Sequence, residues 1–247
     1  MKRLLCVTAH PDDEAGGFGG SLLLYASRGI ETYVICLTPG QAATHRGDTH
    51  SDEELATVRR REFEDSCRIL KVAHGEVLGY RDGALDRTEF YSVVGDLVHR
   101  IRHIRPHVMM TLGPEGAITA HPDHSMAGIF ATMAFHWAGR TNRFTDQLAD
   151  GLSPHRAQKL YYSTSLMTLP DRQPVSPAPA TAVIEVSDYF DAKVQAFKAH
   201  TTQAPLVPIF ENAVKQRGRQ EFFHLAAAII PRTMEMETDL FSGVVED

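Results

Sequence analysis

The sequence predicts an α/β protein with an open, mostly parallel sheet and helices on both of its faces. Short apolar runs at residues 4–9, 32–38 and 108–112 have the composition of strands that are buried on both faces. Segments with helical spacing separate these runs, as the crossovers between parallel strands require. The chain has 247 residues, of which 43% are hydrophobic, and no linker divides it, so we expect one domain over residues 1–247.

The first two apolar runs and the segment between them predict a βαβ unit. Pro11 cannot donate to a sheet ladder, so we expect the first strand to stop there. Four glycines between residues 16 and 20 are expected to let the backbone turn tightly into a helix over residues 21–28. Gly29 would then close this helix as its left-handed cap.

The same alternation of helices and strands continues along the chain. Ser51, with Glu54 three residues later, is a capping-box signature that predicts a helix continuing to Leu70. Pro122 suits the first turn of a helix that follows it. The remaining pattern predicts helices over residues 90–104, 125–137 and 187–200, strands over residues 76–78, 108–112, 159–163 and 182–186, and a short C-terminal element over residues 221–230.

Three polar stretches, residues 39–50, 139–158 and 166–181, show little or no periodicity. Loops of this length on a compact domain are either functional covers or locally disordered. Because the first and third follow strand ends, we expect them to be more mobile than the sheet and to shape a pocket at that edge.

Composition and charge exclude several classes of protein. The net charge is −6 and the only basic cluster is at residues 59–61, beside acidic residues, which favours a solvated helix face and argues against a nucleic-acid partner. Cys6, Cys36 and Cys67 fall in predicted core elements, as buried reduced thiols do. No segment resembles a transmembrane span, and the first apolar run is too short for a signal peptide. We therefore expect a cytoplasmic protein.

Two polar motifs follow predicted strands. His-Pro-Asp-Asp-Glu occupies residues 10–14 after the first strand, and His-Pro-Asp-His occupies residues 121–124 after the strand at 108–112. Open parallel sheets bind ligands beyond the carboxyl ends of their strands, where both motifs lie. A catalytic zinc ion takes three protein ligands, often two histidines and a carboxylate. His10, an adjacent aspartate and a histidine of the second motif supply that set.

Such a metal lowers the pKa of its bound water to about 7 and polarises a carbonyl group. A second carboxylate could accept the proton of the water. The spacing alone leaves open which of Asp12 and Asp13 performs which task.

Together, the two motifs resemble those of the PIG-L or LmbE-like family of zinc-dependent N-deacetylases, which includes enzymes of mycothiol and bacillithiol synthesis. Supporting resemblances are Arg59-x-x-Glu62, residues 80–83, and Lys193 with His200-x-x-Gln203. The resemblance implies a Rossmann-like fold, a zinc cofactor or another divalent metal such as Fe²⁺, and a homo-oligomer. It also implies a small N-acylated amino-sugar conjugate as substrate.

The resemblance assigns roles to individual residues. His10, Asp13 and His124 match the metal ligands, and Asp12 matches the general base that deprotonates the water.

His121 matches the residue that stabilises the tetrahedral oxyanion, with Asp123 placed to orient it or charge it. Arg59 and Asp82 match positions that could hold hydroxyl or phosphate groups of the substrate.

The chain departs from the family pattern in two places. Several members carry a tyrosine shortly before the second motif, where Thr119 and Ala120 stand here, so a second oxyanion donor is not identified. Residues 38–41 also differ from the expected Gly- and Glu-containing version. Glu14 has no assigned role; it could support the site or bond the glycine-rich turn.

Other interpretations of the same residues remain open. A nucleotide-sugar-binding protein is suggested by the glycines at residues 16–20, but their spacing is not Gly-x-Gly-x-x-Gly and Thr38 rather than an acidic residue closes the second strand. A non-catalytic metal-binding protein would have little use for the spare carboxylate and histidine. Arg59 could instead pair with Glu62, and Asp82 could simply be a turn residue.

Overall fold

The computed structural model of the chain describes residues 1–166, 173–216, 219–231, 233 and 235–246. The elements follow in the order β1 (Arg3–Thr8), α1 (Asp13–Ser27), β2 (Glu31–Cys36), α2 (Asp52–Ile69), β3 (His74–Val77), η1 (Leu85–Arg87), α3 (Phe90–Ile104), β4 (Val108–Leu112), η2 (Ala117–Thr119), α4 (Pro122–Ala138), α5 (Thr145–Ala149), β5 (Lys159–Thr164), β6 (Ala182–Glu185), η3 (Ser187–Tyr189), α6 (Phe190–Lys198), η4 (Thr201–Leu206), α7 (Val207–Gln216) and β7 (Gln220–Ala228), where η marks short 3-10 helices.

The described strands form one sheet in the order β3-β2-β1-β4-β5-β7-β6. Only β7 runs antiparallel to its neighbours, β5 and β6, while the other neighbouring strands are parallel. All five residues of β4 are buried, as are the last five of β1. The predicted open and mostly parallel sheet, with strands buried on both faces, is confirmed.

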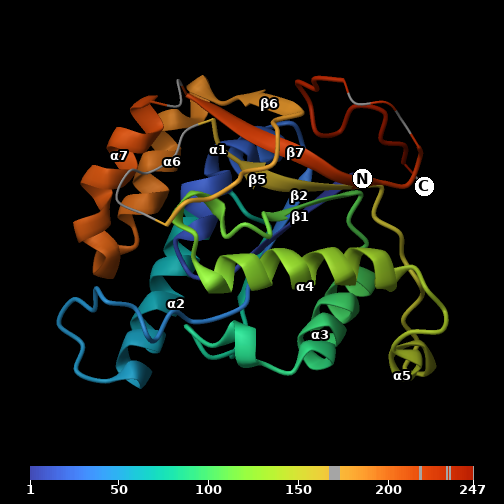
Figure 1. Cartoon of the computed structure of the whole chain (residues 1–247), viewed down its shortest axis with the longest axis horizontal. Coiled ribbons are helices and arrows are strands. Elements are labelled where there is room, and N and C mark those ends of the chain that lie inside the picture. Colours follow the sequence, from blue (N-terminus) through green and yellow to red (C-terminus); the bar gives the residue numbers. More distant parts are fainter. Residues whose placement is uncertain (167–172, 217–218, 232, 234, 247) are drawn as a thin grey trace.

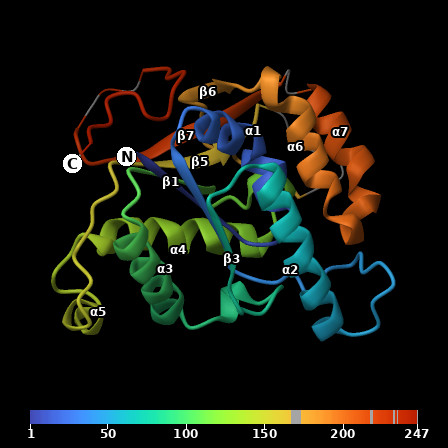
Figure 2. The same cartoon turned by 180° about the vertical axis from the view of Figure 1, so that it is seen from behind.

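Helices cover both faces of this sheet (Figures 1 and 2). α3 packs against α4 on one face, whereas α1, α2 and α6 pack together on the other. The chain order reverses at β1, which lies between β2 and β4, so the loops after β1 and β4 meet at the switch point where α/β sheets bind ligands.

The first helix begins earlier than predicted, at Asp13 instead of residue 21, so the glycines lie inside α1 and not in a turn before it. They allow close packing: a Cβ atom on Gly20 would lie 2.6 Å from Cβ of Val186, and one on Gly19 would lie 3.2 Å from the side chain of Lys193. Gly29 has a φ of 76°, which confirms the predicted left-handed position after the helix.

The capping of two further helices also follows the sequence. Ser51 Oγ accepts the backbone N–H of Glu54 at 3.1 Å, as the capping box predicts. α4 has the expected proline in its first turn but begins at Pro122 and not at residue 125, which places His124 on the helix itself.

The largest differences from prediction are in the C-terminal third. The element expected over residues 221–230 is β7, a strand inserted between β5 and β6, and α7 was not predicted at all. The helix expected over residues 187–200 is shorter, because η3 precedes α6 and α6 ends at Lys198.

The structure agrees with the prediction for some of the three polar stretches and differs from it for others. Residues 39–50 contain no helix or strand, as expected, but residues 139–158 contain α5. Of the loop predicted over residues 166–181, residues 167–172 lie outside the described residues. Among the helices that the structure describes, none is both long and apolar enough to cross a membrane.

Candidate active site and metal centre

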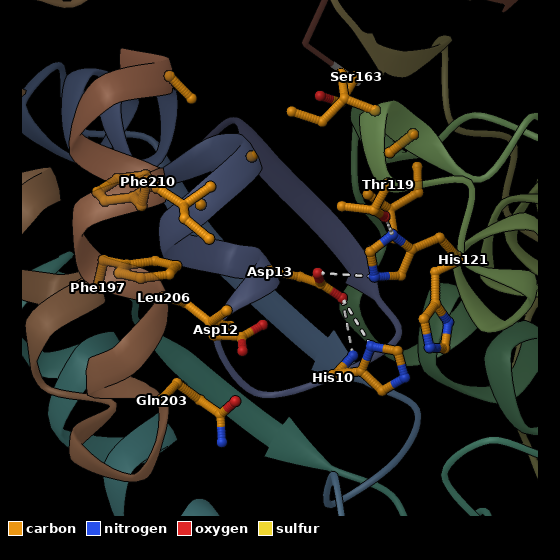
Figure 3. A pocket seen from close by; sticks show the side chains of 18 of the residues that line it. His10, Asp12, Asp13, Thr119, His121, Ser163, Phe197, Gln203, Leu206 and Phe210 are labelled. Atoms are coloured by element: carbon orange, nitrogen blue, oxygen red, sulfur yellow. Dashed lines mark hydrogen bonds and ion pairs between the residues drawn. The ribbon is translucent and has the colours of Figure 1, made fainter. Parts of the chain in front are cut away.

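The first motif folds back over the end of β1. The carboxylate of Asp13, the first residue of α1, accepts the backbone N–H groups of Ala9 and His10 on Oδ2, at 3.1 and 2.9 Å. Its Oδ1 lies 3.1 Å from Nε2 of His124, and its Oδ2 lies 3.7 Å from Nδ1 of His10. Asp13 therefore bridges the two motifs, and Figure 3 shows its carboxylate directed at His10.

Two further carboxylates hold His10. Its Nε2 lies 3.0 Å from Asp82 Oδ1 and 3.3 Å from Asp123 Oδ2. Asp123 also accepts the backbone N–H groups of Gly83 and Leu85, which ties the loop after β3 to the start of α4. In the polypeptide alone, burial lowers the pKa of His10, but the bonds to Asp123 and Asp82 outweigh burial and raise it to about 10.

The second motif presents two histidines with different surroundings. Nδ1 of His124 lies 3.1 Å from the hydroxyl of Thr119, which leaves Nε2 directed at Asp13. Nδ1 of His121 accepts the backbone N–H of Asp123 at 3.2 Å, so the ring proton of neutral His121 is on Nε2. Burial first, and then the neighbouring histidines, lower the pKa of His121, which favours its neutral form.

These contacts revise two expectations. The carboxylate of Asp123 contacts His10 and not His121, which it was expected to orient. Thr119, one of the two residues where the resemblance had led us to expect a tyrosine as a second oxyanion donor, instead places its hydroxyl beside Nδ1 of His124.

Asp12 lies in the turn between β1 and α1 with an unusual backbone conformation. Its φ of 120° is one that residues other than glycine rarely adopt, and such strain clusters at functional sites. Arg59 donates from Nη2 to Asp12 Oδ2 at 2.9 Å and to the carbonyl of Pro11, and from Nη1 to the carbonyl of Gly40 at 3.1 Å. Burial raises the pKa of Asp12 to about 6, against the opposing effect of Arg59.

A solvated helix face was expected for most of residues 59–61, yet Arg59 is only 2% exposed. A Cβ atom on Gly40 would lie 2.1 Å from its Nη1, so the glycine of the divergent segment at residues 38–41 makes room for the guanidinium. Glu62 accepts hydrogen bonds from Thr201 and Thr202 and does not form the alternative ion pair with Arg59.

Glu14 supports the site, which is one of the two roles that the sequence left open for it. It is fully buried, accepts the backbone N–H of Asp12 at 2.9 Å on Oε2, and contacts Ser66 Oγ and His200 Nε2 at 2.5 and 2.6 Å on Oε1. Burial raises its pKa, but the charge of His200 and the hydrogen bonds from His200, Ser66 and the backbone of Asp12 together outweigh burial and lower it. Glu14 therefore fixes the turn that carries Asp12, and the His200 of the C-terminal pattern fixes Glu14.

A pocket of about 480 Å³ opens over these groups. Seven of the eight predicted site residues line it, namely His10, Asp12, Asp13, Arg59, Asp82, His121 and His124. Asp123 lies beneath them and is 1% exposed. Residues 42–45 of the predicted loop cover also line the pocket.

The opposite side of the pocket consists of residues on α6, η4 and α7, of which the sequence analysis named only Gln203. The apolar residues at positions 206, 209, 210, 213 and 214 are spaced at i, i+3, i+4, i+7 and i+8, which is the helical signal that could have revealed them. Two prolines obscured this signal: Pro205 lies inside η4, and Pro208 lies in the first turn of α7, where proline is tolerated.

The donor set fits a divalent metal ion. His10 Nε2 and His124 Nδ1 are held by outer groups, while His10 Nδ1 and His124 Nε2 face the carboxylate of Asp13. Metal-binding histidines have this arrangement, with one nitrogen for the metal and the other bonded to an outer partner. Nitrogens of His10, His121 and His124 also lie within 4.8 Å of one another.

Comparison with known proteins gives a consistent result. Residues 5–135 match the family model described as PIG-L, GlcNAc-PI de-N-acetylase. The 1D-myo-inositol 2-acetamido-2-deoxy-alpha-D-glucopyranoside deacetylase 2 of Catenulispora acidiphila is 28% identical over 98% of this chain and 97% of its own. Diacetylchitobiose deacetylase of Thermococcus kodakarensis is 32% identical over 83% of this chain and 71% of its own.

The fold matches that of a solved structure, N,N'-diacetylchitobiose deacetylase from Pyrococcus horikoshii with an inhibitor. The TM-score is 0.78 at 24% identity, and the match covers 94% of this chain and 88% of the other.

Proposed function

Because the chain belongs to the PIG-L family of de-N-acetylases, we propose that it hydrolyses the amide of an N-acylated amino sugar. Water adds to the amide carbonyl, the C–N bond breaks, and the products are the free amine and a carboxylate. The observation that carries this proposal is the position of Asp12, which lies beside the His10, Asp13 and His124 cluster and is held there by Arg59.

We propose that His10, Asp13 and His124 hold a divalent ion, zinc or a metal of similar preference such as Fe²⁺. When bound there, the ion supplies Lewis-acid polarisation of the carbonyl group and of water. The buried carboxylate and the two restrained imidazoles support this ligand set.

Asp12 acts as the general base in this proposal. Its pKa of about 6 lies close to neutral pH, where a carboxylate can accept a proton from water and return it to the leaving nitrogen. Arg59 keeps the carboxylate in place, and Glu14 holds the backbone of the same turn.

His121 acts as a hydrogen-bond donor to the carbonyl oxygen as negative charge develops on it. The proton on Nε2 of His121 and its lowered pKa suit a neutral hydrogen-bond donor. The ring centroids of His121 and His10 are 4.8 Å apart.

Arg59 and Asp82 line the pocket, and their substrate-binding role remains a proposal. Their contacts with Asp12 and His10 support a second role, in orienting these side chains.

The rival nucleotide-sugar interpretation loses its main support. The glycines that suggested a phosphate-binding turn lie within α1 and serve its packing against Val186 and Lys193.

The test is release of amine from N-acetylglucosamine glycosides by the purified protein, with zinc and after dialysis against a chelator. We expect equal amounts of free amine and acetate with zinc and none after chelation. Binding of one equivalent of zinc without amine release from any N-acylated amino sugar would contradict the proposal and favour a non-catalytic metal site.

A further inference from the structure

The pocket has a wall that amide hydrolysis by Asp12 and His121 does not explain. Seven described residues of α6, η4 and α7 line this wall, six of them apolar and none charged: Phe197, Gln203, Leu206, Ile209, Phe210, Ala213 and Val214. Figure 3 shows Phe197, Leu206 and Phe210 on the side of Asp12 that is away from His121. The wall therefore faces a part of the substrate other than the reacting carbonyl group.

The wall is well packed, but one of its members is exposed. The rings of Phe197 and Phe210 are stacked, with centroids 4.0 Å apart and planes 13° apart. Ile209 lines the pocket although 52% of it is exposed. An exposed apolar side chain at the mouth of a pocket is available to an apolar ligand.

Across from this wall, α1 contributes Gly16 and Gly17, which have no side chains to cover it. A Cβ atom on Gly16 would lie 3.7 Å from the ring of Phe197, which is ordinary van der Waals contact, so α1 approaches the wall closely at this point. The apolar face of the wall stays accessible from the pocket, and Ser163 Oγ, 3.8 Å from the Cβ position of Gly17, is a polar group on the opposite side.

A polyol would bind poorly against this wall. Its hydroxyl groups would lose their hydrogen bonds to water, and among the described residues of the wall only Gln203 could replace them. An alkyl or aryl group would instead remove apolar surface from water on both sides.

On the basis of the proposed amide hydrolysis, we infer that the substrate is an N-acylated amino sugar bearing an apolar group of several carbons, which packs against the wall formed by α6, η4 and α7. The same chemistry could come from the acyl chain of the amide or from an apolar aglycone. The test has one arm for each source.

The first experiment compares kcat/KM for five N-acylglucosamine glycosides. Three carry an N-acetyl group and a methyl, octyl or myo-inositol aglycone; the other two are methyl glycosides with an N-butanoyl or N-octanoyl group. Because each fully buried methylene is worth about fourfold, we expect one octyl or octanoyl compound to exceed the N-acetyl methyl glycoside by at least about tenfold. Whichever of the two compounds has the higher kcat/KM shows whether the aglycone or the acyl group supplies the apolar chain.

The inference is overturned if neither long-chain compound exceeds the N-acetyl methyl glycoside, or if the inositol conjugate is the best substrate. Both outcomes leave amide hydrolysis intact. Absence of amine release from all five compounds would instead contradict the proposed function.

Variants of α7 test where the chain binds. Ile209→Asn changes an exposed residue, and Phe210→Ala removes one ring of the stacked pair. Each should reduce the preference for the long-chain substrate at least about threefold. Asn212→Ala is the control, since Asn212 is exposed on the same helix and does not line the pocket. An unchanged preference in both wall variants would overturn the assignment of this wall.

Discussion

Asp12 and Asp13 are neighbours in the sequence, but their carboxylates meet different groups. Asp13 accepts two backbone N–H groups and faces His10 and His124, and although burial raises its pKa, these histidines hold the pKa well below its usual value. Among the described residues, Arg59 is the one charged side chain that forms an ion pair with Asp12. Burial raises the pKa of Asp12. These surroundings favour a ligand role for Asp13 and a proton-accepting role for Asp12.

This difference predicts opposite responses to two matched substitutions. Asp12→Asn should keep the metal and the fold but lose about a hundredfold to ten-thousandfold in rate, because an amide cannot accept the proton. Asp13→Asn should weaken metal affinity, and added zinc should partly restore its activity. Turnover measured against zinc concentration distinguishes them. Rescue of Asp12→Asn by zinc, with none for Asp13→Asn, would reverse the two roles.

Thr119 gives a second prediction at the scale of single residues. Its hydroxyl lies 3.1 Å from His124 Nδ1, and loss of such an outer partner typically costs about 10–100-fold in metal affinity or activity. Thr119→Val should therefore lower zinc affinity by this factor in a competition titration with a chromophoric chelator. Thr119→Ser retains the hydroxyl and serves as the control. Equal affinity in the valine and serine variants would show that the contact does not support a ligand.

At the scale of the elements, α1 carries the site because it can lie close to α6 and to Val186 at the start of η3. Gly20 has no room for a Cβ atom, which would lie 2.6 Å from Val186. Gly17, one turn earlier, has room, because its Cβ atom would lie 3.8 Å from Ser163 Oγ. The same substitution should thus have opposite effects on stability at the two positions.

Gly20→Ala should destabilise the protein by about 1–3 kcal/mol through overpacking, less the gain in helix propensity. Gly17→Ala should leave stability unchanged or raise it by up to about 1 kcal/mol. Urea unfolding of both variants measures the difference. Val186→Ala in the Gly20→Ala background should recover part of the loss, and equal stability of the two single variants would contradict the close approach of α1 and Val186.

At the scale of the whole molecule, the C-terminal segment is tied to the sheet by a buried ionic group. The carboxylate of Glu237 accepts hydrogen bonds from the ammonium of Lys159, at 2.7 Å, and from the hydroxyl of Tyr161. The backbone N–H of Glu237 donates to the carbonyl of Thr181, and its carbonyl accepts from the N–H of Val183. The ends of the chain also meet, with the ammonium of Met1 3.4 Å from the carboxylate of Glu246 (Figure 1).

Glu237→Gln should destabilise the protein by about 3–5 kcal/mol, because it leaves the buried ammonium of Lys159 without its carboxylate. The double variant Lys159→Met/Glu237→Leu should recover most of this loss, since it removes both charges. Chemical unfolding gives the free energies. Activity per folded molecule should not change, because none of these side chains lines the pocket. Equal losses in the single and double variants would argue against a charge effect.

The sequence was sufficient to predict which motifs meet. Apolar runs define β1 and β4, parallel strands present their carboxyl ends at one edge, and the two polar motifs follow directly. The meeting of the two motifs depends only on this topology, so it could be predicted, whereas the choice of Asp13 and His124 within the motifs came from the family resemblance. The opening of α2 was equally local, because Ser51 and Glu54 lie three residues apart.

The tertiary structure alone decided the partners of the other side chains. Arg59 reaches Asp12 across 47 residues, Asp123 reaches His10 across 113, and His200 reaches Glu14 across 186. The packing of the glycines of α1 against Val186 and the insertion of β7 between β5 and β6 were also decided only in the folded molecule. Periodicity records which face of an element is buried but not which distant group faces it, and that pairing depends on how the layers pack.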